Sequence, residues 1–421
     1  MTVTFHDIDI DDPSFYVNDP WPVFKQLRDE DPFHYVPELD VFVVTRHEDI
    51  IEIGKRPAEF INSKALFLND IRYAKSIEEA KAKGEYQDDG TAFVDMFFPK
   101  GGEIVATTDQ PRHAELRRVL APTFTKEVRE NVSVPLQAYV DELLDAVEPG
   151  TTVEWMRFAA LVPIFAASRL IGLPDTDIKQ IQGWGDQLEK LAAVDITMEE
   201  IEAAAAEFQT LQAYIVKNME EKTANPGPDL LSLLLQQELD DAKVSQANVV
   251  TLSMMMLSAA SDTTRSLLAG LVNYLAQDPE QWRKLRDDRS LVPNAVEEVL
   301  RWVSPARAFV RTATVDTVVN GQEIKAGQYV YLMYMSANRD ERVFPNPDVL
   351  DIERKEAKKH LSFGAGIHLC PGTRIVRDEG PIVLDALLDR FSRIELVEEP
   401  TQIMNIIHRN GWTSMPVKFH V

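Results

Sequence analysis

The hydrophobic positions of the 421-residue chain follow two different periods. Apolar residues recur at helical spacing through much of residues 136–235 and again through residues 245–277, which predicts helices there. Within residues 305–335 the period shifts to two, which is typical of extended strands. The pattern predicts a mainly α protein with a smaller β-rich part, drawn from about residues 33–60, 305–335 and 394–421.

The N-terminal region mixes both periods. Residues 13–32 predict a short amphipathic helix, and two strands around a turn at residues 37–40 precede a helix that begins at about His47. In residues 62–108 a charged helical run, IEEAKAKGEYQDD, leads into the apolar FVDMFF, and no overall period is present. Taken alone, the charged run is typical of a solvated surface excursion.

The run from about Ser245 to Gln277 predicts one long helix. At 1.5 Å per residue it measures roughly 50 Å, enough to cross the whole molecule. The string AASDTT, residues 259–264, places polar side chains in its apolar centre. The hydroxyl of Thr263 can reach the carbonyl of Ala259 one turn earlier, and such a bond bends or opens a helix. The centre of this helix is therefore unusual for a buried span.

The single cysteine, Cys370, lies in the middle of LSFGAGIHLCPGTRIVRDEG, residues 361–380. Most lone cysteines are small buried hydrophobes, but Gly364 and Gly366 would let a flat ligand lie against this loop. Pro371 suits the first position of the helix that follows, which predicts Cys370 as the N-cap of that helix. Unpaired amides and the positive end of the helix dipole favour a thiolate there. The sulfur is placed to be a metal ligand.

The residues around the sulfur narrow the choice of metal. A structural zinc ion needs four ligands, and the chain has no second cysteine. One thiolate presented by a glycine loop suits the axial position of a haem iron. The loop resembles the cysteine-ligand loop of the cytochrome P-450 haem-thiolate monooxygenases at Phe363, Gly366, His368, Cys370 and Gly372. Residues that usually follow in the soluble bacterial members are matched by Arg377 and Glu379.

Further motifs of that family follow in its order along the chain. DQPRHAELRRVLAPTF, residues 109–124, resembles a haem-contacting helix, and its His113 and Arg117 share one helix face because they are four residues apart. Arg311 matches the position from which an arginine reaches a haem propionate. The resemblance implies that His113, Arg117, Arg311 and His368 hold the propionates.

A structural ion pair is also implied. Glu298 and Arg301 can pair at this spacing on a helix, and they match the Glu-Arg motif that the family places after the long helix. The spacing itself is common in this chain, and position alone selects Glu298. Other pairs with the same spacing are Glu115–Arg118, Glu154–Arg157 and Glu280–Arg283.

In the long helix, Asp262 and Thr263 align with the acid and alcohol that deliver protons to the oxygen site in the family. In the family, glycine is commoner at the position of Ala260. The methyl group of Ala260 is expected to narrow the groove for oxygen. The substrate pocket is expected to include Ala259, Ala260, Phe309 and Val310. By resemblance, residues 62–108 form a lid, and two helices on either side of Asp195 form a roof.

The resemblance runs from about residue 13 to the C-terminus, and it implies a triangular helical prism around one haem b with Cys370 as the axial iron ligand. The implied reaction inserts one oxygen atom from O2 into an apolar small molecule, by hydroxylation or epoxidation. Two alternatives use the same fold. A peroxide-driven peroxygenase usually lacks the acid-alcohol pair, and a non-catalytic haem-binding sensor needs Cys370 but not Thr263.

The electrons are expected to come from another protein, since the chain has neither a P-loop nor a complete GxGxxG fingerprint. The resemblance implies a ferredoxin and an NAD(P)H-dependent ferredoxin reductase. Basic residues expected on the cysteine side offer a docking surface for an acidic partner. They are Arg112, Arg117, Arg118, Lys126, Arg129, Arg374 and Arg377.

Composition sets the outer limits. A net charge of -24 and a pI of about 4.8 argue against a nucleic-acid-binding surface. Residues 1–12 lack the basic and apolar segments of a signal peptide. The apolar residues 158–173 are too few for a membrane span and include Arg169. We therefore expect a cytoplasmic protein without stable membrane insertion. A chain of this length can form one large domain or two ordinary ones. The resemblance implies one domain covering residues 1–421, and we expect it to be a monomer.

Overall fold

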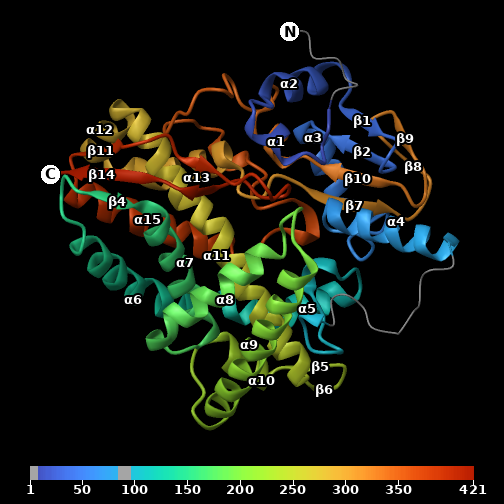
Figure 1. The fold of residues 1–421 in the computed structure, drawn as a ribbon, viewed down its shortest axis with the longest axis horizontal. Helices are drawn as coiled ribbons and strands as arrows, with labels where there is room; N and C mark the ends of the chain where they lie inside the picture. Colours follow the sequence, from blue (N-terminus) through green and yellow to red (C-terminus); the bar gives the residue numbers. More distant parts are fainter. Residues whose placement is uncertain (1–7, 84–95) are drawn as a thin grey trace.

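The computed structural model describes residues 8–83 and 96–421. The end of the predicted charged run and the start of FVDMFF, in residues 84–95, lie outside the described residues. Figure 1 shows two sheets at opposite ends of the molecule with helices between them. The prediction of a mainly α protein with a smaller β-rich part is confirmed. None of the helices in the described ranges combines the length and the apolar character needed to cross a membrane.

Helices form most of the described chain. The N-terminal helices are α1 (Pro13–Val17), α2 (Trp21–Glu30), α3 (His47–Gly54) and α4 (Leu68–Lys83). The central helices are α5 (Arg112–Leu120), α6 (Lys126–Asp145), α7 (Trp155–Ile171), α8 (Ile178–Lys190), α9 (Met198–Ala224) and α10 (Leu230–Gln236). The C-terminal helices are α11 (Gln246–Gln277), α12 (Pro279–Asp287), α13 (Val292–Val303), α14 (Tyr334–Ala337) and α15 (Thr373–Arg390). As predicted, two helices flank Asp195.

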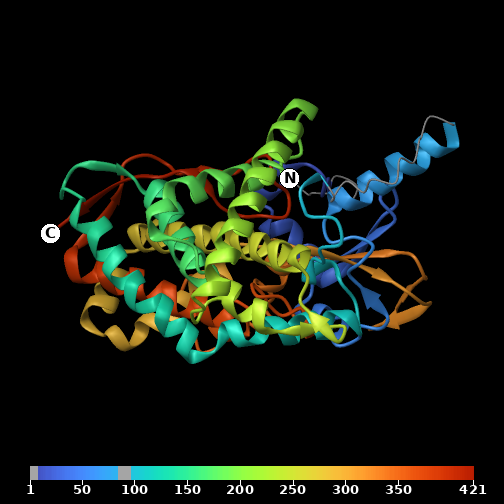
Figure 2. The same cartoon turned by 90° about the horizontal axis from the view of Figure 1, so that it is seen from below.

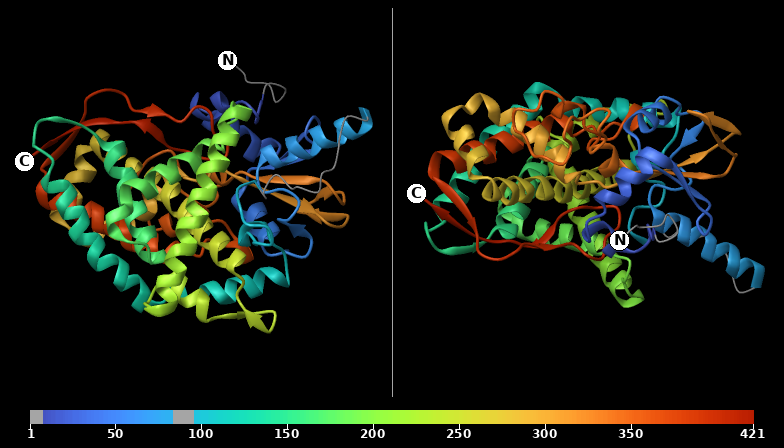
Figure 3. Two further views of the ribbon diagram at one scale, coloured as in Figure 1. Left: turned by 60° about the horizontal axis from the view of Figure 1, so that its bottom comes forward. Right: turned by 90° about the horizontal axis from the view of Figure 1, so that it is seen from above.

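The strands form one larger sheet and several small ones. The five-stranded sheet has the order β1 (Phe33–Val36), β2 (Val41–Val44), β10 (Tyr329–Leu332), β7 (Phe309–Ala313) and β3 (Phe60–Ile61). The three-stranded sheet has the order β11 (Arg393–Leu396), β14 (Pro416–His420) and β4 (Thr152–Glu154). The two-stranded sheets pair β5 (Glu238–Leu239) with β6 (Ala242–Lys243), β8 (Thr317–Val319) with β9 (Gln322–Ile324), and β12 (Thr401–Gln402) with β13 (Trp412–Ser414). Helix α4 projects beyond the five-stranded sheet (Figure 3).

Helix α11, with 32 residues, runs through the middle of the molecule (Figure 2). Its N-cap is Ser245, whose hydroxyl accepts a hydrogen bond from the amide of Asn248 at 3.1 Å. It packs along α7, where the indole N–H of Trp155 donates to the carbonyl of Leu268 at 3.1 Å. Because buried apolar residues dominate both helices, their contact forms the centre of the main core.

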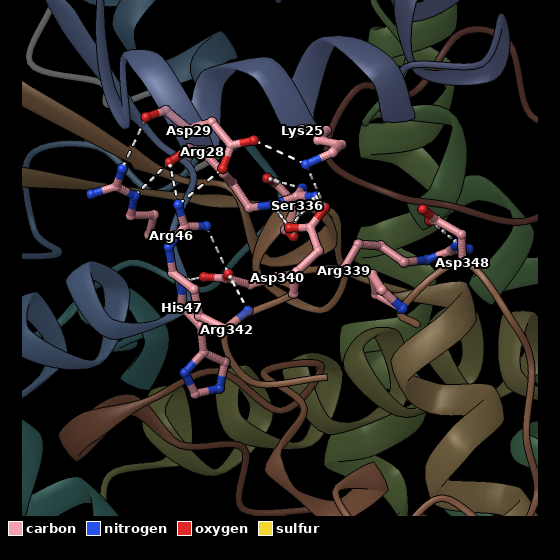
Figure 4. Close-up of polar contacts among 12 residues, drawn as sticks. Lys25, Arg28, Asp29, Arg46, His47, Ser336, Arg339, Asp340, Arg342 and Asp348 are labelled. Atoms are coloured by element: carbon pink, nitrogen blue, oxygen red, sulfur yellow. Dashed lines mark hydrogen bonds and ion pairs between the residues drawn. The ribbon is translucent and has the colours of Figure 1, made fainter. Parts of the chain in front are cut away.

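A polar network anchors the N-terminal helices to residues 336–342 (Figure 4). Arg28 of α2, only 2% exposed, donates from Nη1 to the carbonyl of Ser336 at 3.2 Å. Asp340 accepts a hydrogen bond from the amide of His47, the first residue of α3, at 3.1 Å and pairs with Arg342 at 3.2 Å. Because Arg28 and Asp340 are almost fully buried, the network fixes the N-terminal region against residues 336–342.

Candidate active site

The loop before Cys370 is closed by its own backbone. The amide of Cys370 donates to the carbonyl of Phe363 at 2.9 Å. Gly364 and Gly366 have φ angles of +75° and +72°, in the left-handed region that glycine adopts without strain. A side chain on Gly366 would also overlap the carbonyl oxygen of Gly54 in α3. The backbone of the loop therefore requires both glycines.

The helix after the loop begins later than the sequence predicts. Helix α15 starts at Thr373 with Gly372 as its N-cap, so the prediction of Cys370 as N-cap is wrong. Pro371 and Gly372 form a turn ahead of the helix instead. Burial raises the pKa of the Cys370 thiol, while the amides of Gly372 and Thr373 and the charge of Arg117 act in the opposite direction.

Four nitrogen-bearing side chains converge beside this loop, and we call His113, Arg117, Arg311 and His368 the basic cluster. The rings of His113 and His368 lie 4.2 Å apart, and Arg117 donates to the carbonyl of Leu369 at 3.0 Å. Burial and the charges of Arg311, His113 and Arg117 lower the pKa of His368 to about 3. In the described part of the chain, the buried Nδ1 of His113 has no hydrogen-bond partner. The basic cluster is therefore a site that favours an anion.

The middle of α11 has an accessible face. Ala259 is exposed, and Ala260, Asp262 and Thr263 are partly exposed, whereas most of the helix is buried. The hydroxyl of Thr263 donates to the carbonyl of Ala259 at 3.0 Å, the contact that the sequence predicts. These residues form an accessible stretch near the centre of α11 that a ligand can contact.

Asp262 is paired with an arginine from the C-terminal part of the chain. Nη1 of Arg409 lies 3.4 Å from Oδ1 of Asp262, and the Arg409 side chain is 5% exposed. The segment that carries Arg409 is fixed by Arg307, which donates to the carbonyl of Ile406 at 2.9 Å. The sequence analysis missed Arg409, because no spacing rule connects it to Asp262.

Comparisons with known proteins decide the family. A family model described as Cytochrome P450 matches residues 190–419. The chain belongs to the cytochrome P450 family. Among curated relatives, cytochrome P450 CYP107DY1 from Priestia megaterium is 34% identical, over 90% of this chain and 89% of the relative. Nocardicin C N-oxygenase from Nocardia uniformis subsp. tsuyamanensis is 33% identical, over 91% and 90% respectively.

Solved structures agree with this membership. The crystal structure of CYP108D1 from Novosphingobium aromaticivorans matches with a TM-score of 0.81 at 28% identity, covering 97% of this chain and 96% of that one. The relatives are bacterial P450 enzymes, so this chain is a P450 monooxygenase of the bacterial type.

P450 enzymes bind haem, and the residues of this P450 fit that group. The basic cluster presents four nitrogen-bearing side chains to one region, with the orphaned Nδ1 of His113 among them. Carboxylates are the groups that such a cluster binds best, and haem carries two of them as propionates. The only thiol of the chain lies in the adjacent loop.

The predicted pocket residues Phe309 and Val310 lie on different sides of β7. Phe309 is partly exposed, and its ring lies 5.5 Å from that of Phe67, just ahead of α4. Val310 is fully buried in a core cluster with Tyr331. Because successive strand residues face opposite sides, Phe309 and Arg311 share one side and Val310 takes the other.

Glu298 and Arg301 form the predicted pair, fully buried at 2.7 Å. Arg354, which the sequence analysis missed, joins them, with Nε 3.0 Å from Oε1 of Glu298. Arg301 also donates to the carbonyls of Asn338 and Pro347, each at 2.9 Å. The three charged groups therefore bind α13 to the chain that precedes the cysteine loop. Because 56 residues separate Arg354 from Glu298, no local spacing could have connected them.

The predicted docking surface is partly neutralised by ion pairs. Arg129 pairs with Asp378, and Arg377 pairs with Glu297. Arg112 lies 2.6 to 2.8 Å from the carboxylates of Glu103, Glu115 and Asp240. In contrast, Arg118 donates to a backbone carbonyl, and Arg374 is exposed with no ion pair to any described residue. Arg118 and Arg374 are thus the residues best able to attract an acidic partner.

Proposed function

We propose that this P450 is a haem-thiolate monooxygenase that inserts one oxygen atom from O2 into an apolar small molecule, by hydroxylation or epoxidation. The observation that carries the proposal is the assembly around the cysteine loop. Arg117 of α5 contacts Leu369, beside Cys370, and His113 contacts His368 in the same loop. Arg311 comes from β7 in the five-stranded sheet, and its charge is one of the causes that lower the pKa of His368. This arrangement supports haem b as the cofactor.

In this proposal Cys370 would ligate the haem iron, and the basic cluster would hold the propionates. When bound, the haem supplies the chemistry of oxygen activation. Thr263 and Asp262 are the proposed proton carriers. The Thr263 hydroxyl donates to the carbonyl of Ala259, and the Asp262 carboxylate pairs with Arg409. Glu298, Arg301 and Arg354 have a structural role.

The substrate contacts in this proposal come from α11 and β7. Ala259, Ala260 and Phe309 present small or aromatic apolar surface, which suits an apolar substrate. Phe67 adds a second aromatic ring next to Phe309. A substrate that fits these groups is held mainly by apolar contact, while Asp262 and Thr263 lie on the same accessible face of α11.

A ferredoxin, reduced by an NAD(P)H-dependent reductase, is the proposed electron donor. The chain has a net charge of -24, so long-range charge repels an acidic ferredoxin and a local positive site must overcome this. Arg118 and Arg374 are the proposed contacts. The proposed state is a cytoplasmic monomer in which residues 1–421 form one domain.

Product formation tests the proposal against its two alternatives. With ferredoxin, reductase and NAD(P)H, the parent protein should form product, and Thr263→Ala should consume O2 with much less product. A peroxygenase would form product from hydrogen peroxide alone and would be unaffected by Thr263→Ala. A haem-binding sensor would form no product under either condition. Conversion of substrates is followed by mass spectrometry, with O2 uptake measured in parallel.

A further inference from the structure

Next to Glu298, a second buried carboxylate faces the cysteine loop. The side chain of Glu297 is 4% exposed, and its Oε2 lies 3.1 Å from Nε2 of His360. Arg377 donates from Nε to Oε1 at 2.6 Å and from Nη2 to Oε2 at 3.0 Å. His360 precedes the cysteine loop and Arg377 follows it, within α15. One carboxylate on α13 therefore ties together the two segments that flank Cys370.

The hydrogen bonds assign the protonation of His360. The amide of Ser362, which can only donate, lies 3.1 Å from Nδ1, so Nδ1 accepts and Nε2 carries the proton. Nε2 then donates to Glu297. Burial lowers the pKa of His360. Burial also opposes ionisation of Glu297, but the hydrogen bonds from His360 and Arg377 outweigh it and lower the pKa of Glu297 to about 2. The contact is thus between a neutral imidazole and a carboxylate.

Phe363 connects this network to the cysteine. Its ring centroid lies 5.4 Å from that of His360, and the guanidinium carbon of Arg377 lies 5.2 Å from the same ring. The carbonyl of Phe363 accepts the hydrogen bond from the amide of Cys370. A displacement of Phe363 would therefore be transmitted directly to the backbone of Cys370.

We infer that Glu297, His360 and Arg377 are positioning residues that hold Cys370 in the orientation in which its sulfur binds the haem iron. This inference rests on the proposed role of Cys370 as the iron ligand. Loss of one member leaves a buried polar group without its partner and releases one flank of the loop. The residues act through Phe363 and the loop backbone, and none of them is proposed to touch the haem or the substrate.

The variants separate the individual contacts. Glu297→Gln keeps the size of the side chain and removes its charge. His360→Gln keeps a donor near the position of Nε2, and His360→Asn keeps an acceptor near that of Nδ1. Arg377→Gln changes a partly exposed side chain and so is the least disruptive variant. Asp340→Asn is the matched control, because it removes a 1% exposed carboxylate that pairs with Arg342 outside this network.

The experiment uses haem-loaded protein, reduced with dithionite in the presence of carbon monoxide. The measurements are the rate at which the thiolate-type Soret band is lost, the midpoint potential of the haem, and Tm. Glu297→Gln should lose the band about tenfold faster than the parent, in line with the loss of a buried hydrogen bond to a charged group. The His360 variants and Arg377→Gln should show the same change to a smaller extent, with a shifted potential. Asp340→Asn should keep the parent rate and potential even where its Tm falls.

If the rate of band loss follows Tm across all variants, Asp340→Asn included, the residues act through general stability and the inference is overturned. Arg377→Gln and His360→Asn decide the question in the same way if Glu297→Gln does not fold. A parent protein without any thiolate-type band would instead overturn the proposed ligation by Cys370. The two failures therefore give different results.

Discussion

Arg409 and Asp262 form an ion pair that connects the C-terminal segment to the accessible centre of α11, with Nη1 3.4 Å from Oδ1. The Arg409 side chain is almost fully buried, and the Asp262 side chain is 20% exposed. The pair is therefore only partly screened by solvent. Since Thr263 follows Asp262 directly, this ion pair lies beside the residue whose hydroxyl donates to the carbonyl of Ala259.

The Arg409–Asp262 pair leads to a double-variant prediction. Asp262→Asn removes the proposed proton carrier and should slow product formation by about 100-fold, the scale of general acid–base catalysis. Arg409→Gln should give a smaller decrease, because the carboxylate is retained but less well oriented. In the double variant the rate should equal that of Asp262→Asn, since the interaction has already been lost. Rates are measured at saturating substrate, and strictly additive losses would contradict the account.

Glu298 provides a prediction about stability. Glu298→Gln leaves Arg301 and Arg354 buried beside a neutral side chain and should lower the free energy of unfolding by about 3–5 kcal/mol. Glu280→Gln is the matched control, because Glu280 pairs with Arg283 at the same spacing on an exposed surface, where solvent screening leaves an ion pair little effect on stability. Urea unfolding followed by circular dichroism measures both, and equal losses would show that burial of the triad has no special effect.

Arg311 provides a prediction about haem retention. If it holds a propionate, Arg311→Ala should remove a charge-assisted contact of about 1.5–3 kcal/mol. Transfer of haem to an excess of apo-globin should then be about tenfold faster or more. Arg390→Ala changes an arginine that pairs with Asp141 and Asp145, away from the basic cluster, and serves as the control. Equal transfer rates in the two variants would remove Arg311 from the haem site.

The docking surface can be tested by charge reversal. Arg374→Glu and Arg118→Glu should slow reduction by ferredoxin at low ionic strength without changing the affinity for substrate. The difference from the parent should shrink as salt is added, because exposed charges are screened. Arg283→Glu is the control, since Arg283 is exposed on α12. Stopped-flow reduction measures the rate, and an effect that is independent of salt would argue against electrostatic docking.

Local spacing predicted most of the fold and several contacts. The strands β1 and β2 with the turn between them, the bounds of α11 to within one residue at its start, and the pairing of Glu298 with Arg301 all follow from patterns within a few residues. The bond from Thr263 to the Ala259 carbonyl follows from the helical repeat in the same way. These features depend on short-range geometry, which the sequence contains directly.

The features that were missed depend on long-range geometry or on closely balanced alternatives. Arg354 and Arg409 meet their partners across the fold, and no periodic pattern connects such positions. Strand β4 has three residues, too few for a readable alternation, yet it pairs with β14. Pro371 allows a helix to begin directly after Cys370, but the chain makes one more turn before α15 begins.

The proposed ligation by Cys370 is tested most directly by the optical spectrum of the purified, haem-loaded protein after reduction with dithionite in carbon monoxide. The account predicts the strongly red-shifted Soret band that is typical of thiolate-ligated haem, and its loss in Cys370→Ser. Because Cys370 is the only cysteine of the chain, no other residue can supply a thiolate. Haem bound without that band in the parent protein would contradict the proposed site and mechanism.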